Sequence, residues 1–373
     1  MTKINDNILS DGDLHEAENR IIGLDFIRIL LVLLIFAFHS QIHFDCYYYW
    51  LNDFVRMGAI AITAFFILSG YSLILSTSHK DFTKIKDIKQ FYIKRLIRIL
   101  PLYYSVALIR VVMDLMVGKS TFAEVAILFP VELFATQSTF TTLFPYSHNN
   151  GTWFISCLII CYIFFPFIQN LFLQLSVKTK TITGVVLCSI LFYAPFIQHF
   201  FQLNDLSVYT CPFYRLIEFV LGIIIAQINT MPIENKLLLV IRKPIICTLA
   251  FVLLVVLVSM GRRFDLPVDY MLYNIVTVPC FLVIITSLGS MRFKSIKRSC
   301  FLLYLSNISF TFFLCQVLPL WGISRFLYAL ISIESNLIRI LISFMTCMIG
   351  SIAIYYSIEK PATSFLKKKL LKI

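Results

Sequence analysis

Residues 23–43 have the sequence GLDFIRILLVLLIFAFHSQIH, an apolar run that carries few charged or titratable side chains. A helix of about 20 residues is long enough to cross the roughly 30 Å hydrocarbon core of a bilayer. A charge near mid-membrane costs at least about 2.5–3.5 kcal/mol on insertion scales, so Arg28 and His39 each need a partner or a function. The segment therefore predicts a membrane-spanning helix that carries chemistry.

The two polar side chains of this run share one helix face. Their separation of eleven residues is roughly 20° past three full turns and about 16.5 Å along the axis, near the reach of a pantetheine arm. A guanidinium suits a phosphate anchor, and a histidine suits proton transfer from a hydroxyl. The alternative is that Asp25 pairs with Arg28 and that His39 bonds a backbone carbonyl. His43 completes an HxxxH pair without the Glu of a zincin, so we expect no metal.

The rest of the chain repeats this apolar pattern. Of its 373 residues, 59% are hydrophobic and 14% charged, with a mean hydropathy of +0.85. Soluble domains are roughly 45–50% apolar, so the composition excludes a water-soluble fold. We expect an all-α, polytopic transmembrane helical bundle over 22–361, with an acidic tail at 1–21 and a basic tail at 362–373. About ten spans are predicted, near 22–43, 58–76, 96–117, 152–173, 182–202, 213–229, 245–260, 270–289, 300–322 and 337–358, and the short segment 122–137 is predicted to be interfacial or re-entrant.

Lysine and arginine are distributed unevenly between the predicted loops. With the N-terminus inside, one side holds 23 of the 32 basic residues and the other side holds 5. The positive-inside rule then places both termini in the cytoplasm. The net charge of +12 reflects topology and contact with an anionic lipid bilayer, and we expect no nucleic-acid partner.

Basic and small residues gather at the predicted cytoplasmic ends of spans two and three. Arg95 and Arg98 lie three residues apart, on the same helix face, and can hold a diphosphate. An ordinary positive-inside anchor is an equal alternative. Ser69, beside Gly70 in GAIAITAFFILSGYSL, lies where a ligand or a neighbouring helix can approach closely.

Other polar residues in apolar segments favour structural roles. Arg215 and Glu218 at i,i+3 predict a buried ion pair. Glu359, in the closing IEKP, is a possible brace for Arg95 or Arg98. Trp153 begins a span after the longest non-cytoplasmic loop, a position typical of an interfacial aromatic, although such a ring can also stack on a sugar.

Several segments, in order and over nearly the whole chain, resemble the acyltransferase family 3 of bacterial membrane proteins. They are the Arg28–His39 pair, GAIAITAFFILSGYSL, the RxxR of Arg95 and Arg98 followed by ILPLYY, TWFISCLIICYIFFP, YRLIEFVLGIIIA and IEKP. The resemblance implies an inner-membrane O-acyltransferase, of the stand-alone kind. It moves an acyl group, commonly acetyl from acetyl-CoA, to a hydroxyl of a surface glycan or lipid-linked sugar such as O-antigen, lipopolysaccharide, capsule, exopolysaccharide or peptidoglycan.

The resemblance assigns the family's essential pair to Arg28 and His39, and its RxxR to Arg95 and Arg98. We accordingly expect these three arginines, with Ser69, to hold acyl-CoA, His39 to act as the base, and Trp153 to contact the acceptor. One departure concerns FLCQVLP (313–319), where the family often has YLxHxP and Gln316 replaces the histidine. A transporter or flippase of a lipid-linked sugar is the alternative function, and a membrane scaffold is a third.

The charge asymmetry generates a first prediction. Reporter fusions at Ile373 and within the 138–150 loop should report opposite sides of the membrane, with Ile373 in the cytoplasm, because an odd number of spans would put many basic residues outside. A periplasmic signal at Ile373 would overturn this topology.

Overall fold

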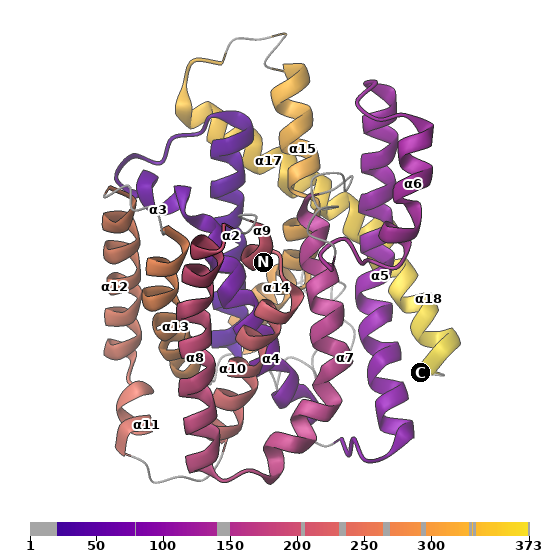
Figure 1. Ribbon diagram of the computed structural model, residues 1–373. Coiled ribbons are helices and arrows are strands. Elements are labelled where there is room, and N and C mark those ends of the chain that lie inside the picture. The colour runs from indigo at the N-terminus through magenta and orange to yellow at the C-terminus, as the bar shows by residue number, and fades with distance from the viewer. Residues whose placement is uncertain are drawn as a thin grey trace.

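The computed structural model describes residues 21–78, 80–139, 150–202, 206–230, 236–263, 269–291, 296–327, 330 and 333–371. Every regular element in these ranges is a helix, and the long helices lie side by side as a bundle (Figure 1). The all-α bundle expected from the composition is therefore confirmed. The long helices of the bundle are α2 (Ile22–Phe44), α4 (Ala61–Thr77), α5 (Ile85–Met116), α7 (Trp153–Gln174), α8 (Val177–Phe200), α10 (Pro212–Thr230), α12 (Pro244–Arg263), α13 (Asp269–Leu288), α14 (Ile296–Cys315) and α17 (Asn336–Ile354).

Shorter helices connect or extend these. They are α3 (Asn52–Arg56), α6 (Phe122–Leu133), α9 (Leu206–Tyr209), α11 (Lys236–Ile241), α15 (Val317–Gly322) and α18 (Lys360–Leu371). Single 3₁₀ turns occupy Tyr49–Leu51, Gly58–Ile60 and Asn150–Thr152, and π-helical turns occupy Ile323–Leu327 and Tyr355–Glu359.

Seven helical segments of the described chain are long and apolar enough to cross a membrane, and three shorter apolar helices accompany them. Each predicted span overlaps one of the long helices, but the ninth, 300–322, is divided between α14 and the short helix α15, and the exact number of crossings stays a prediction. The protein is a multi-pass membrane protein.

Two segments refine the boundaries taken from the sequence. Helix α5 begins at Ile85, well before the predicted start of span three at 96, and it passes through Pro101. Residues 85–98 contain neither Gly nor Pro, so their charged stretch continues the helix beyond the apolar part. Helix α6 opens with a capping box between Thr121 and Glu124. Its 12 residues reach only about 18 Å, too short for a perpendicular crossing.

Helices α4 and α10 pack with their backbones in direct contact. A Cβ atom on Gly70 would lie 2.0 Å from the carbonyl oxygen of Phe219, and one on Gly222 would lie 2.0 Å from that of Ile67. Real Cβ atoms essentially never come this close to backbone, so only glycine permits the contact. Gly23 plays the same part between α2 and α13, where its Cβ would lie 2.2 Å from the oxygen of Leu288. Small residues thus set the spacing of the central helices, as is common in membrane bundles.

This packing generates a second prediction. Gly70→Ala and Gly222→Ala should each destabilise the protein by about 1–3 kcal/mol, because the added methyl group must push two backbones apart. Thermal unfolding in detergent should show a lowered Tm for both variants. Gly322→Ala is the matched control, since no atom of the described residues lies within 4 Å of its added Cβ. Equal Tm values for all three variants would show that the close contact between α4 and α10 does not require glycine.

Candidate active site

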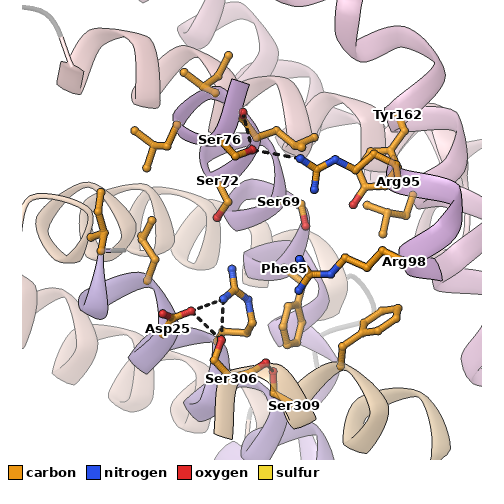
Figure 2. A pocket seen from close by; sticks show the side chains of 18 of the residues that line it. Asp25, Phe65, Ser69, Ser72, Ser76, Arg95, Arg98, Tyr162, Ser306 and Ser309 are labelled. Carbon is orange, nitrogen blue, oxygen red and sulfur yellow. Dashed lines mark hydrogen bonds and ion pairs between the residues drawn. The ribbon is translucent and has the colours of Figure 1, made fainter. Parts of the chain in front are cut away.

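One large cavity of about 770 Å³ opens among helices α2, α4, α5, α7 and α14. Its volume lies within the roughly 300–1,000 Å³ of typical ligand sites. Residues at its ends lie far apart along the helices, because Phe65 and Ser78 both line it and are separated by about 19.5 Å of α4. Figure 2 shows Arg95 and Arg98 on one side, with Asp25, Ser306 and Ser309 on another.

Arg28 is held at this cavity by two neighbours. Its Nη1 donates to Oδ1 of Asp25 at 2.6 Å and to Oγ of Ser306 at 3.0 Å, and Ser306 in turn donates to the same Asp25 oxygen at 2.7 Å. The Asp25–Arg28 pair that the sequence left as an alternative is therefore present. Arg28 nonetheless lines the cavity and stays partly exposed. Pairing and a ligand role are thus compatible at this residue.

Arg95 and Arg98 enter the same cavity from α5. The Nη2 of Arg95 donates to Oγ of Ser76 at 3.1 Å, and its guanidinium lies 5.5 Å from the Phe91 ring centroid and 6.0 Å from that of Tyr162. Arg98 is exposed and makes no hydrogen bond or ion pair with the described residues. The two arginines therefore differ, since Arg95 is oriented by the protein and Arg98 is available.

The face of α4 that borders the cavity is lined with serines. Ser69, Ser72 and Ser76 all contribute to the lining (Figure 2). The Oγ of Ser72 and the Nε of Arg95 are buried and have no partner among the described residues. The sequence suggested that a ligand or a neighbouring helix approaches closely at Ser69 and Gly70. Both occur, because Ser69 lines the cavity and Gly70 packs against α10.

Three phenylalanines form the deep end of the cavity, which we call the aromatic floor. Phe65, Phe154 and Phe313 come from α4, α7 and α14, and all three line the cavity. Their ring centroids lie 6.2 Å (Phe65–Phe154), 5.4 Å (Phe65–Phe313) and 5.0 Å (Phe154–Phe313) apart. Tilted and edge-on pairs of this kind are favourable contacts beyond their buried area.

His39 lies beyond this floor and is not among the cavity-lining residues. Two α2–α14 contacts fix its level, because Arg28 bonds Ser306 and Phe36 packs on Phe312 at 5.7 Å. Phe313 therefore lies about one turn short of His39 along the bundle. The Nδ1 of His39 is buried without a partner among the described residues, and its ring stacks on that of His43 at 5.8 Å.

The same two contacts between α2 and α14 place Gln316 at about the level of His39 along the bundle. It is fully buried, and its Nε2 donates to the carbonyl oxygen of Phe313 at 3.2 Å. Its Oε1 has no partner within the described ranges. Gln316, which replaces the histidine of the family pattern, thus has an unpaired acceptor oxygen near the level of His39.

Arg215 and Glu218 form a completely buried ion pair, with Nη1 2.7 Å from Oε1. Thr63 of α4 donates to the same Glu218 oxygen at 2.8 Å, and Arg215 donates to the carbonyl of Tyr209 at 2.9 Å. Trp153 belongs to this cluster: it is only 6% exposed, packs on Tyr209 at 4.8 Å and lies 5.8 Å from the Arg215 guanidinium. These contacts brace helices α4, α7 and α10.

Glu359 is held by a residue of α14, and the charge of Arg98 on α5 also acts on it. It accepts a hydrogen bond from Thr311 of α14, and none of the ion pairs among the described residues joins it to Arg95 or Arg98. The contact with Thr311 joins the last helices to α14, and the role of Glu359 as a brace for those arginines stays a prediction.

Sequence reasoning missed several residues of the cavity. Ser306 and Ser309 of α14 and Tyr162 of α7 line it beside the arginines. The spacing of Ser306 and Ser309 at i,i+3 in an apolar segment was an available signal, because two hydroxyls then share one face. Within the described ranges, no group of three or more His, Cys, Asp or Glu side chains is placed to hold a metal ion.

The geometry defines a helical membrane protein whose bundle encloses a cavity lined by three arginines, several serines and apolar side chains. Residues 21–356 match the family described as "Acyltransferase domain", so the chain belongs to the acyltransferase 3 family. This confirms the family expected from the motifs.

One curated relative is named acyltransferase MdmB, from Streptomyces mycarofaciens. It is 27% identical over 191 residues, which are 46% of this chain and 47% of that protein. The chain thus spans about half the length of the curated relative that it matches. No solved structure matches the chain.

Proposed function

We propose that this protein is an inner-membrane O-acyltransferase that moves an acyl group, most simply acetyl, from cytoplasmic acyl-CoA to a hydroxyl of a cell-surface polysaccharide. The observation that carries the proposal is the convergence of Arg28, Arg95 and Arg98 on one cavity of ligand size. The family supplies the reaction class, and the cavity supplies a place for an anionic donor.

The cavity suits the phosphates of coenzyme A. Arg98 offers an unpaired forked guanidinium, and Arg28 and Arg95 are already oriented by Asp25 and Ser76. Guanidiniums match phosphate geometry bidentately and stay charged at any physiological pH. The hydroxyls of Ser69 and Ser72, one of them without a partner, add hydrogen-bonding groups for the amide-rich arm of the donor.

The donor enters from the end of the bundle that the charge asymmetry predicts to be cytoplasmic. Ile21, Ser78 and Thr230 mark that end of the lining, where α2 begins and where α4 and α10 end. From Arg28 the pantetheine arm then runs about 16.5 Å along α2 toward His39, past the aromatic floor. The proposal therefore requires the ring of Phe313 to move aside when the thioester arrives.

The proposed chemistry uses His39 as general base. His39 removes the proton of the sugar hydroxyl while the hydroxyl oxygen attacks the thioester carbonyl carbon. The new ester C–O bond forms, the C–S bond breaks, and the thiolate of coenzyme A takes up the proton that His39 carries. The base is regenerated, so each turnover gives one ester and one free thiol.

A third prediction concerns the donor. Arg98→Ala should raise the acetyl-CoA concentration for half-maximal transfer by about 10- to 150-fold, because a lost charge-assisted phosphate bond costs roughly 1.5–3 kcal/mol. Lys94→Ala is the control, since Lys94 is exposed on the same helix and does not line the cavity. Reconstituted protein assayed at varied donor and acceptor concentrations gives the answer. If only the dependence on acceptor changed, Arg98 would not be a donor anchor.

A fourth prediction concerns the base. His39→Ala should lower transfer by about 10²–10⁴-fold while acetyl-CoA still binds, as expected for a lost general base. Arg28→Ala should instead weaken acetyl-CoA binding. Product formation and donor binding are measured side by side on purified, folded variants. Near-normal turnover of His39→Ala would exclude the histidine from the mechanism.

A further inference from the structure

A second polar cluster lies at the opposite end of the same helices. Arg110 and Asp114, near the end of α5, form an ion pair with Nε 2.8 Å from Oδ2. The Arg110 guanidinium lies 4.8 Å from the ring centroid of Trp321 in α15, and its charge acts on His43 in the last turn of α2. We call these four residues, His43, Arg110, Asp114 and Trp321, the far-end cluster.

The far-end cluster and the arginine cavity lie on either side of His39. His43 is one turn beyond His39 and stacks on it at 5.8 Å. Arg110 is twelve residues past Arg98 on α5, about 18 Å further from the cavity mouth. A group held at the far-end cluster would therefore meet His39 from the side opposite the donor.

Unpartnered buried atoms also gather at this end. Asp114 is only 2% exposed, yet its Oδ1 has no hydrogen-bond partner among the described residues. The Nδ1 of His39 and the Oε1 of Gln316 are also buried without a hydrogen-bond partner among the described residues. Buried polar atoms in native proteins are nearly always satisfied, so atoms left open in one region point to a polar ligand with several hydroxyls.

The chemistry of the cluster suits a sugar better than an anion. The charges of Arg110 and Asp114 cancel within their ion pair, and a carboxylate oxygen that is free to accept repels a phosphate but binds a hydroxyl. The Arg110 guanidinium lies over the Trp321 ring, Phe326 meets that ring edge-on at 6.5 Å, and Trp321 as a residue stays partly exposed. An aromatic ring with one apolar face and neighbouring hydrogen-bonding groups matches the apolar face and hydroxyl edge of a pyranose.

We propose that the far-end cluster is the binding site for the sugar acceptor, with Asp114 accepting from its hydroxyls and Trp321 packing on its ring. This inference rests on the proposed function and deepens it. Trp321 then takes the acceptor role that the sequence suggested for Trp153, whose ring packs on the protein's own Tyr209. Donor and acceptor enter from opposite ends and meet at His39.

The experiment measures glycan binding without catalysis. Surface polysaccharide from cells that lack the protein, freed of O-acyl groups by mild alkali, is titrated onto the full-length protein in nanodiscs, and acetyl-CoA binding is measured in parallel. Trp321→Ala and Asp114→Asn should each weaken polysaccharide binding at least 10-fold. Both should leave acetyl-CoA binding within about 2-fold of wild type, and Trp321→Phe should retain most of the glycan affinity.

Trp50→Ala is the matched control, since Trp50 is 83% exposed and lies outside the cluster. Wild-type glycan affinity in both Trp321→Ala and Asp114→Asn would overturn the acceptor site and leave the proposed function standing. A wild-type protein that neither binds nor acylates the polysaccharide would overturn the acceptor class and this site together. A third outcome is that Asp114→Asn loses both glycan and acetyl-CoA binding while Trp321→Ala binds both normally. That result would show that Asp114 is needed for folding, and it would also overturn the site.

Discussion

The rest of the structure depends on the backbone contact between α4 and α10. Gly70 and Gly222 allow each helix to touch the other's carbonyl oxygens, and no other residue type permits that distance. The same helix pair is joined at its other end by Thr63, which donates to Glu218. Because α4 is fixed against α10 on one side, its serine face is turned toward α5 and α14, where the arginines and hydroxyls of the cavity meet.

Much of the arginine-lined cavity could be predicted from the sequence, because it depends on features that a single helix displays. Apolar runs of membrane length predicted the long helices, and each predicted span overlaps one of them. Arg28, Arg95, Arg98 and Ser69 were each chosen for a charge or small side chain near one membrane face, and one cavity brings all of them together. Shared membrane depth was therefore enough to group them.

Contacts between distant segments could not be predicted in the same way. The position of Trp153 in the sequence is consistent both with an interfacial aromatic and with a sugar contact. Only the fold shows that Tyr209, from a distant segment, packs on its ring. Glu359 ends its span near the basic side, but Thr311 is the partner that it meets. The pairing of Arg110 with Trp321 is likewise invisible in sequence, since a cation–π contact between separate helices leaves no spacing to detect.

The aromatic floor has a consequence for the membrane itself. A bundle with a charged cavity on one side and a polar cluster on the other has only one apolar layer between two groups of polar side chains. Phe65, Phe154 and Phe313 supply that layer, with rings in mutual contact and no polar atom among their side chains. An ion that crosses such a layer loses its hydration shell without replacement. The same rings that end the cavity therefore place an apolar barrier to ions between its charged lining and the far-end cluster.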